Sequence, residues 1–379
     1  MRILIASDKY KGSLTAPEVA AILKRVLESH LPEVSCDVCP IADGGEGTTE
    51  AMIAALGGER INLPTEDARG RAITAAYGMI QRNGRKLAVM EMSAASGLAK
   101  VSDLPLDPMT ASTFGTGLMV LDAFQRGASH LIIGIGGSAT NDAGCGMARA
   151  LGWRFLQANG QPIKDIPRDL DQLGCILPPP ARLSLDIQVA CDVSNPLLGP
   201  EGCTRIYGAQ KGICDPEAHE SRLQHLTEIV KRDVTDQDLA STAGAGAAGG
   251  LGYGLMAFGQ ARLVSGFDLI ADVIQLEKRI AEADLIITGE GRLDGQTLHG
   301  KGPLGVAQMA RRLGKKVVAF AGAIEPSPAL LAHFDAMHAI KPAEMPVAEA
   351  MARASDLLEQ AAHRALPSLR QVLANQPAF

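Results

Sequence analysis

Aromatic side chains are scarce in this sequence: they make up 3% of the 379 residues, with one Trp, four Tyr and eight Phe. Proteins that bind single-stranded nucleic acid need aromatic rings on which bases can stack. Excess positive charge is missing as well, because 36 Lys and Arg stand against 42 Asp and Glu, and the formal net charge is −6. Nucleic-acid binding draws most of its affinity from a basic surface. Both shortages therefore argue against a nucleic-acid-binding protein.

Long hydrophobic runs are also absent. No segment reaches the ~20 consecutive apolar residues that a membrane-spanning helix needs. The first apolar run ends at Asp8, too early for a secretory signal peptide. We therefore expect a cytoplasmic protein without membrane contact. The seven cysteines include one close pair, Cys36 and Cys39, but no second pair or histidine partner accompanies it, which favours reduced structural thiols.

Glycine, by contrast, is abundant, with 41 of 379 residues, about 11% against a typical ~7%. The glycines fall in clusters, which indicates places where the backbone turns sharply or comes close to a ligand. Hydrophobic residues at 46% and charged residues at 21% are ordinary for a packed soluble protein. At roughly 150 residues per domain, the length predicts two or three folded domains.

The two ends of the chain carry the pattern of a parallel sheet with alternating helices. Near the N-terminus, an apolar strand at residues 3–6 is followed by a helix over residues 16–30, with Pro17 in its first turn, and by a strand at residues 34–40. The last third repeats this order. Its predicted strands cover residues 284–291, 316–323 and 336–342, with a helix after Pro303 and an amphipathic helix at the end.

The middle of the chain follows a different order. The strand-like segments ITAAYGMI, KLAVMEM and IQVACDV alternate with shorter helices and long loops, which indicates a mixed sheet. We therefore predict an α/β protein with a Rossmann- or flavodoxin-like parallel-sheet domain formed by residues 1–62 and 270–379. A second, mixed-sheet α/β domain of residues 63–269 interrupts it.

Five polar segments that contain glycine follow predicted strands. In an open α/β sheet, ligands bind beyond the carboxyl ends of the strands, where such loops emerge. The segments are SDKYKGSLT, PIADGGEGT, GIGGSATNDAG, ACDVSNPLLG and ITGEGRLDGQT.

Three glycine patterns resemble nucleotide-binding motifs without completing them. Gly244, Gly246 and Gly249 match GxGxxG, but no strand precedes them. A GxGxxA match at residues 134–139 follows a strand but lacks the later acidic residue that holds a ribose. A near match to a P-loop at residues 295–302 has glycine where the magnesium-binding hydroxyl belongs. These departures argue against a dinucleotide fold and against a P-loop enzyme.

The segment GIGGSATNDAG offers groups that suit an anion and a metal ion. It combines flexible backbone amides, the hydroxyl groups of Ser138 and Thr140, and Asp142 near the start of a predicted helix. The alternative is an ordinary strand-to-helix turn that Asp142 caps.

Charged residues at the other strand ends complete the set. Glu290, Arg292 and Asp294 are predicted just past a buried strand, where they serve a site or form a solvated ion pair. Asp43 and Glu46 stand at a helix mouth, where carboxylates also complement the helix dipole.

Two lysines and one aspartate add further candidates. Lys11 and Lys211 lie on glycine-flanked turns, and Asp192 follows an apolar strand, so solvated lysines and an Asx turn are the simpler interpretations. Taken together, these residues supply acids for magnesium, cations for phosphate and carboxylate, and a candidate base, which phosphoryl transfer requires.

The same segments resemble a known family. Along nearly the whole chain, SDKYKGSLT, PIADGGEGT, FGTG, GIGGSATNDAG, CDVSNPLLG, YGAQKG, AGAGAAGGLG, ITGEGRLDGQT and GKGPLGVA closely resemble segments of the bacterial class I glycerate kinases. The resemblance implies phosphorylation of D-glycerate by ATP with Mg²⁺, at the 2-hydroxyl, to give 2-phosphoglycerate. It also implies two α/β domains with the active site in the cleft between them.

The resemblance extends to individual residues, whose roles we assign from the chemistry above. Catalysis is assigned to Asp192, Lys211 and Arg292, substrate or nucleotide binding to Asp8, Lys11, Ser13, Asp43, Gly136, Gly137, Ser138 and Lys301, and metal binding to Glu46, Asp142, Glu290 and Asp294. The family often has Ser, Phe and Gly where Lys9, Tyr10 and Ala143 stand in this sequence.

Two alternatives stay open at this point. One is a kinase for another short hydroxy acid, or for the 3-hydroxyl of glycerate. The other is a non-catalytic protein that senses a phosphorylated sugar acid, although the density of carboxylates at strand ends favours catalysis. The sequence leaves the oligomeric state open, and a homo-oligomer is compatible with it.

Overall fold

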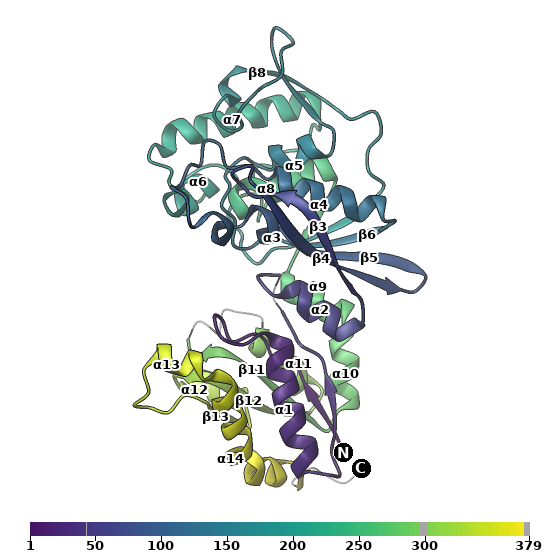
Figure 1. Cartoon of the computed structure of the whole chain (residues 1–379), viewed down its shortest axis with the longest axis vertical. Coiled ribbons are helices and arrows are strands. Elements are labelled where there is room, and N and C mark those ends of the chain that lie inside the picture. The colour runs from purple at the N-terminus through teal and green to yellow at the C-terminus, as the bar shows by residue number, and fades with distance from the viewer. Residues whose placement is uncertain (43, 296, 298–301, 375–379) are drawn as a thin grey trace. The chain divides into compact units, whose positions relative to one another are not determined.

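The computed structural model describes residues 1–42, 44–295, 297 and 302–374 (Figure 1). Through its internal contacts the chain divides into two compact units. The first unit comprises Met1–Asp43, Glu50–Gly57 and Phe267–Phe379, and the second comprises Gly44–Thr49 and Gly58–Gly266. The domain boundaries after residues 62 and 269 stay predictions.

The first unit is built on a five-stranded parallel sheet, as the sequence predicts for the two ends of the chain. Numbered within the unit, the strands follow the order 2-1-3-4-5 of flavodoxin-like sheets. The predicted apolar runs form these strands because a parallel sheet is buried on both faces. In sheet order they are β13 (Ala336–Ala339), β12 (Lys316–Ile324), β11 (Leu285–Leu293), β1 (Arg2–Ile5) and β2 (Ser35–Val38).

Helix α1 (Ala16–His30) covers one face of this sheet and has the predicted bounds. A capping box starts it: the Thr15 hydroxyl accepts from the Glu18 amide at 3.3 Å, and the Glu18 carboxylate accepts from the Thr15 amide at 2.8 Å. The C-terminal helix α14 (Ala354–Ala374) packs beside α1 on the same apolar core.

The other helices of the first unit complete its layers. Helix α11 (Gly302–Arg312) connects β11 to β12 and contacts both strands, and α10 (Leu276–Glu282) contacts α11 and β1. Because parallel crossovers are right-handed and the strand order reverses between β1 and β11, α11 lies on the face opposite α1. Three further helices are α9 (Gly266–Val273), α12 (Pro328–Leu331) and α13 (Val347–Ala352).

The second unit is built on a six-stranded mixed sheet, again as predicted. Four neighbouring strands are parallel, and the last two run antiparallel at one edge. In sheet order they are β10 (Arg262–Val264), β9 (Asp186–Ala190), β6 (His130–Gly134), β5 (Arg85–Glu91), β4 (Ala72–Arg82) and β3 (Glu59–Glu66). A separate antiparallel pair consists of β7 (Arg154–Gln157) and β8 (Leu173–Leu177).

A two-residue turn joins β4 to β5. Asn83 and Gly84 both have positive φ, 49° and 75°, as a type I′ turn requires. The antiparallel strands β4 and β5 are therefore joined by a short turn, whereas the parallel strands need longer connections that contain helices.

The helices of the second unit pack with its sheet in one apolar core (Figure 1). They are α3 (Ser93–Ser96), α4 (Phe114–Gln125), α5 (Cys145–Ala150), α6 (Cys203–Tyr207), α7 (Pro216–Asp233) and α8 (Ala247–Gly259), with 3₁₀ turns at Leu98–Val101, Leu170–Gln172 and Ala209–Lys211. Helix α2 (Thr48–Leu56) begins in the second unit and continues in the first.

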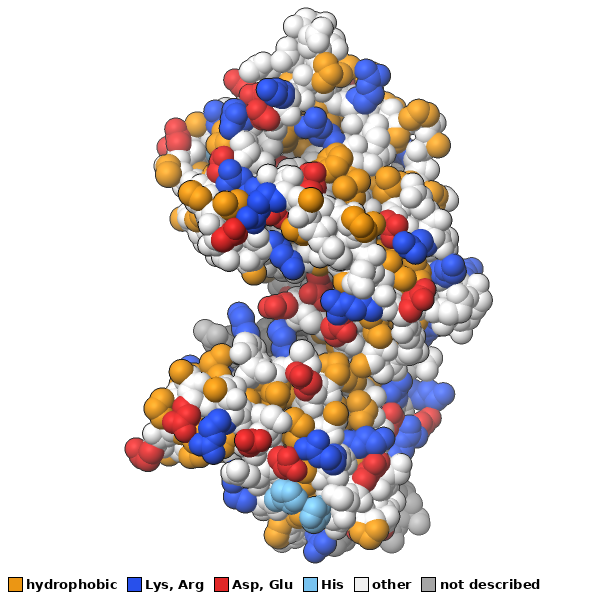
Figure 2. Space-filling model, viewed as in Figure 1, with side chains coloured by type: hydrophobic (Ala, Val, Ile, Leu, Met, Phe, Trp, Pro, Cys, Tyr) orange, Lys and Arg blue, Asp and Glu red, His pale blue; other side chains and the backbone are white. Residues whose placement is uncertain are grey.

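Three further features bear on the expectations from the sequence. Within the described part of the chain, no helix is both long and apolar enough to span a membrane. All seven cysteines, including Cys36 and Cys39, are free thiols. On the visible face of each unit, acidic and basic side chains are interspersed rather than gathered into one broad basic surface (Figure 2).

Candidate active site

Three strands of the second unit end side by side and bring their loops to one edge of the sheet. Glu91 of β5 is paired with Gly134 of β6, and Gly134 with Ala190 of β9. Because these strands are parallel, their carboxyl ends lie together. The segment GIGGSATNDAG after β6 and the segment CDVSNP after β9 therefore emerge as neighbours, as the sequence predicts for ligand-binding loops.

A third predicted segment, DGGEG, crosses the same edge. A Cβ at Gly134 would overlap the Gly44 carbonyl oxygen, and a Cβ at Gly44 would overlap the Ala190 side chain. Gly45 lies close to Gly136, whose added Cβ would be 3.5 Å from the Gly45 Cα. The described part of this segment thus lies over the ends of β6 and β9 because Gly44 and Gly134 lack side chains.

Glu91 fixes this crossing and is a residue that the sequence analysis missed. Its carboxylate accepts from the Gly47 amide at 3.1 Å and from the Thr49 amide at 2.8 Å, at the start of α2. An acidic group at the first turn also complements the helix dipole. Its one sequence signal is a carboxylate at the end of the apolar strand KLAVMEM. Glu46, a predicted metal ligand in the crossing segment, is exposed.

The loop after β6 presents bare backbone outward and buries its polar side chains. Gly136 and Gly137 are exposed, whereas Ser138 and Thr140 are buried. Lys211 lies beneath them with only 2% of its surface exposed, and its ammonium donates to the Ser138 hydroxyl and to the Thr140 carbonyl, both at 2.7 Å. The structure therefore brings four predicted site residues together: Gly136, Gly137, Ser138 and Lys211.

Burial sets the electrostatics of this loop. It lowers the pKa of the Lys211 ammonium to about 8, because a charge loses its hydration inside the protein. Cys203 and Asp142 oppose this shift. Lys211 is thus a buried cation that still carries its proton near neutral pH.

A polar cluster behind the loop, also missed from sequence, holds Asn141. The Asn141 amide contacts the Cys203 thiol at 3.2 Å and the Thr204 hydroxyl at 3.3 Å. The His219 ring, on α7, contacts the Asn141 carbonyl through Nε2 at 3.0 Å, which requires a proton on Nε2. Burial lowers the pKa of His219, so the ring is neutral.

Asp142, a predicted metal ligand, is fully buried inside the fold. Its carboxylate accepts from the Thr113 amide and hydroxyl, both at 2.8 Å, and from the Gly144 and Gly146 amides, both at 3.1 Å. Burial raises the pKa of Asp142, and these hydrogen bonds oppose the rise. The contacts match the alternative interpretation, in which Asp142 anchors the turn, because metal binding would have to break several of them.

Asp192 is exposed beyond the end of β9, at the same sheet edge. Its Oδ1 accepts from the Gly266 amide at 3.0 Å and from the Ser265 hydroxyl at 3.3 Å. The preceding Cys191 amide donates to the Val264 carbonyl at 2.9 Å, which extends the pairing of β9 with β10. The carboxylate is therefore held at a fixed place while remaining open to solvent.

In the first unit, the predicted site residues follow β1 or lie at the end of β11, the two strands between which the strand order reverses. Open α/β sheets bind ligands at such a position. The Asp8 amide donates to the Gly289 carbonyl at 2.9 Å, so the loop after β1 runs along β11. The Asp8 carboxylate accepts from the Lys9 amide at 2.6 Å and lies near Gly302, at the start of α11.

The segment GEGRLDG corrects one expectation. Glu290 and Arg292 are not past the strand but inside it, because β11 continues its pairing with β12 as far as Leu293. Residues two apart in a strand share a face, so Glu290, Arg292 and the following Asp294 lie along one side. The Arg292 guanidinium pairs with Asp294 at 3.0 Å and also with Glu325, which matches the predicted ion-pair alternative.

Thr297 connects the acids of this segment and was missed from sequence. Its hydroxyl donates to the Glu290 carboxylate at 2.9 Å and accepts from the Asp294 amide at 3.1 Å. Buried Tyr10 lies close by, and its pKa is raised by burial and, second, by the Glu290 charge. Tyr10 also donates to the Phe320 carbonyl at 2.9 Å, a bond that phenylalanine at this position would not make.

The other predicted residues of the first unit are less enclosed. Lys11 is exposed, and the Ser13 hydroxyl donates to the Tyr10 carbonyl at 3.0 Å. Asp43 and Lys301 lie outside the described residues.

A ready-made metal cage is absent from the described residues, where no three His, Cys, Asp or Glu side chains meet to hold an ion. Magnesium does not need such a cage, because it commonly takes one or two carboxylates and completes its shell with phosphate oxygens and water. The Glu290 and Asp294 carboxylates are oxygen donors of this kind, and they fit such a partial site.

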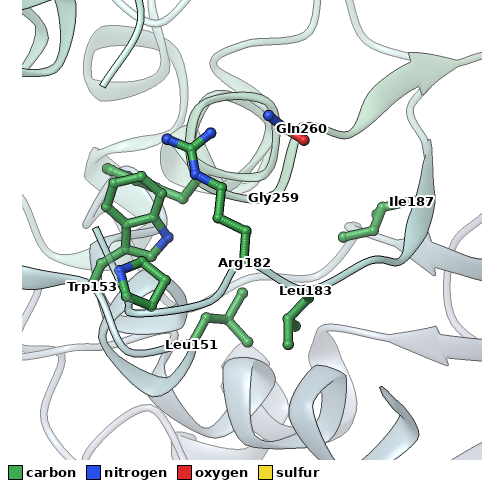
Figure 3. A pocket seen from close by; sticks show the side chains of 9 residues that line it. Leu151, Trp153, Arg182, Leu183, Ile187, Gly259 and Gln260 are labelled. Carbon is green, nitrogen blue, oxygen red and sulfur yellow. The ribbon is translucent and has the colours of Figure 1, made fainter. Parts of the chain in front are cut away.

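A pocket elsewhere in the second unit does not fit a nucleotide. It has a volume of about 20 Å³, room for roughly one water molecule. It lies at the other end of β9 from Asp192, and its lining includes Trp153, Arg182, Ile187 and Gly259 (Figure 3). The Arg182 guanidinium stacks 5.2 Å from the centre of the Trp153 ring.

Comparison with known proteins identifies the family. Residues 3–370 match the sequence pattern of the glycerate kinase family. The chain belongs to this family. It is therefore a kinase, and the sequence-based resemblance is confirmed.

The similarity to individual relatives covers nearly complete chains. A glycerate kinase of Halalkalibacterium halodurans is 41% identical over 95% of this chain and 96% of its own. A glycerate 2-kinase of Escherichia coli K12 is 42% identical over 86% of each chain. A crystal structure from Salmonella typhimurium LT2, described as a glycerate kinase 2, superimposes with a TM-score of 0.87 at 38% identity, covering 98% of both chains.

We expect Asp142→Asn to lower the free energy of unfolding by about 1–3 kcal/mol, because the amide puts a donor among groups that all donate to residue 142. Urea unfolding with and without Mg²⁺ measures this, with the exposed Asp171→Asn as control. Unchanged stability together with lost Mg²⁺ affinity would instead make Asp142 a metal ligand.

The lowered pKa of Lys211 predicts that activity falls at alkaline pH. As pH rises through about 8, the ammonium loses its proton, so the charge that attracts an anion to the loop disappears while two N–H donors remain. A pH profile of kcat/KM measures the fall, and Lys211→Met should remove it.

The stability of the fold should respond to Lys211 in the opposite direction. Its pKa in the folded state lies below the value of about 10.4 in an unfolded chain. The unfolded state therefore binds more protons, and raising the pH from 8 toward 10 favours folding at this group. An alkaline loss of activity that tracks unfolding in the same buffers would contradict the prediction.

Proposed function

We propose that this kinase transfers the γ-phosphoryl group of ATP to the 2-hydroxyl of D-glycerate, giving 2-phosphoglycerate and ADP, with Mg²⁺ as cofactor. Family membership supports glycerate as the substrate, and the name of the Escherichia coli relative supports the 2-hydroxyl. One observation carries the chemistry: the exposed backbone of Gly136 and Gly137, the buried Lys211 ammonium and the Asp192 carboxylate belong to one edge of the second unit's sheet.

The second unit supplies an anion site and a base in this proposal. The exposed backbone of Gly136 and Gly137 lies beside a buried cation, an arrangement that favours an anionic group such as the phosphoryl group or the substrate carboxylate. The 2-hydroxyl oxygen forms a bond to the γ-phosphorus while the bond from that phosphorus to the leaving ADP oxygen breaks. The hydroxyl proton passes to the Asp192 carboxylate.

The first unit supplies groups for the nucleotide and the metal. We assign Asp8, Lys11 and Ser13 to nucleotide binding, and Glu290 and Asp294 to Mg²⁺, which when bound offsets the negative charge of the phosphates. Arg292 has five N–H donors, so it can keep its ion pair with Asp294 and still bind a phosphoryl oxygen.

Four other predicted residues keep or change their roles. Asp43 and Lys301 stay proposed ligand-binding residues, and Glu46 stays a proposed metal ligand. Asp142 takes the role of an anchor for the loop after β6.

A coupled assay tests the proposal. We expect ADP release that depends on D-glycerate and stops in excess EDTA. We also expect a product that enolase alone converts to phosphoenolpyruvate, because enolase acts on 2-phosphoglycerate and not on its 3-isomer. A product that needs a mutase first would place the phosphate on the 3-hydroxyl.

D-lactate serves as the matched control substrate in that assay. It has the same carboxylate and 2-hydroxyl but no 3-hydroxyl. Turnover of D-lactate as fast as D-glycerate would point to a broader hydroxy-acid kinase. ATP and glycerate that bind without any ADP release would support a sensor instead.

Asp192→Asn tests the base. The substitution keeps the shape and removes the basicity, so kcat should fall by about 10²-fold, the lower end for a lost general base, because phosphoryl-transfer transition states are often loose. Initial rates at saturating substrates measure kcat, and calorimetry checks that ATP still binds.

The matched control is Asp186→Asn. Asp186 is the first residue of the same strand, β9, at the end opposite Asp192, and it pairs on the surface with Arg262. We expect its kcat to stay within about twofold of the parent. An Asp192→Asn protein as active as the Asp186→Asn protein would remove Asp192 from catalysis.

A further inference from the structure

The proposed chemistry gives no role to the GxGxxG match at Gly244, Gly246 and Gly249. The match belongs to a glycine tract, residues 244–254, that leads into α8 and forms its first turns. Within α8, Ala248, Gly249 and Gly250 have left-handed φ values of 55°, 66° and 85°, so the helix is kinked there. The tract is therefore shaped for close contact rather than for a straight helix.

The kink packs directly on the loop after β6. The Ala143 amide donates to the Gly249 carbonyl at 3.1 Å, and a Cβ at Gly249 would overlap the Thr140 carbonyl oxygen. One turn later, a Cβ at Gly254 would lie 2.5 Å from the Ala143 carbonyl oxygen. The Thr140 carbonyl is the same group that accepts from Lys211, so the tract and the buried cation fix one atom from two directions.

The beginning of the tract packs on the loop that carries Asp192. The Gly246 amide donates to the Asn195 carbonyl at 2.9 Å, and a Cβ at Gly246 would overlap the Pro196 carbonyl oxygen. A Cβ at Gly244 would lie 2.9 Å from the Cys191 sulfur. One continuous stretch of backbone therefore touches both predicted active-site loops of the second unit.

We infer that the glycine tract is a positioning element for catalysis, which holds the loop of Gly136–Asp142 and the loop of Asp192 at a fixed separation. Gly246, Gly249 and Gly254 are required by backbone contacts with these loops, not by a nucleotide. The consequence for catalysis rests on the proposed function, because a phosphoryl acceptor and its base must be aligned within a fraction of an ångström. The consequence for the two loops does not depend on that function.

Gly249→Ala, compared with Gly84→Ala, tests the inference. Both glycines have left-handed φ, 66° and 75°, so both substitutions introduce the same kind of backbone strain. At Gly84 an added Cβ meets nothing within 4 Å, whereas at Gly249 it must displace Thr140. A third variant, Gly254→Ala, adds the clash with Ala143 without a left-handed φ.

Hydrogen–deuterium exchange read by mass spectrometry measures the loops directly. We expect faster exchange in residues 136–144 and 191–197 of Gly249→Ala and Gly254→Ala, and unchanged exchange there in Gly84→Ala. Emission from Trp153, the single Trp, checks that the far end of α8 stays packed, because its ring contacts Phe258 at 5.2 Å between centroids. If Gly249→Ala does not fold, Gly254→Ala alone carries the test.

Kinetics give the second measurement. We expect kcat for glycerate phosphorylation to fall at least about tenfold in Gly249→Ala, with KM for ATP within about twofold of the parent. If the parent enzyme does not phosphorylate glycerate, the proposed function is wrong. The exchange data still test the inference about the two loops in that case. Unchanged exchange in both loops of a folded variant would overturn the inference. A KM for ATP that rises steeply while both loops stay protected would overturn it as well, because a loss of ATP binding alone would identify the tract as a nucleotide-binding motif.

Discussion

The candidate site of the second unit depends on close contact between two segments of backbone at the carboxyl ends of its parallel strands. A side chain at Gly134 would overlap the carbonyl of Gly44, and one at Gly44 would overlap Ala190. Without these contacts the segment of residues 44–47 could not cross the ends of β6 and β9, and Glu91 would lose the amides it holds. The arrangement of the remaining groups at this edge follows from that closeness.

Charge is used differently in the two units. The second unit relies on one buried ammonium, Lys211, whose partners are neutral oxygens of Ser138 and Thr140, so its positive charge is not cancelled by direct contact with a carboxylate. The first unit pairs its cation, Arg292, with Asp294 and Glu325 at a more exposed site. A chain with a net charge of −6 can therefore still offer an anion a local positive site.

The sequence predicts what local pattern controls. The helix over residues 16–30, the parallel strands and the segments that meet at the edge of the second sheet all follow from apolar periodicity and from loops after strands. Glu91 and Thr297 escaped detection, because their importance comes from the amides and carboxylates that tertiary pairing brings to them. The predicted end of β11 was too early for the same reason, because Glu290 and Arg292 interrupt the apolar pattern and the strand is continued by pairing with β12.

The glycine excess separates into three groups once the structure is known. Gly84 needs a left-handed φ and has open space around it, whereas Gly134 and Gly249 lack room for a Cβ beside another backbone. Gly136 fits neither group: its φ is not left-handed, it is exposed, and an added Cβ would meet Gly45 at an ordinary 3.5 Å. Among the described residues, neither conformation nor internal packing demands glycine at residue 136, which supports the ligand-binding role proposed for it.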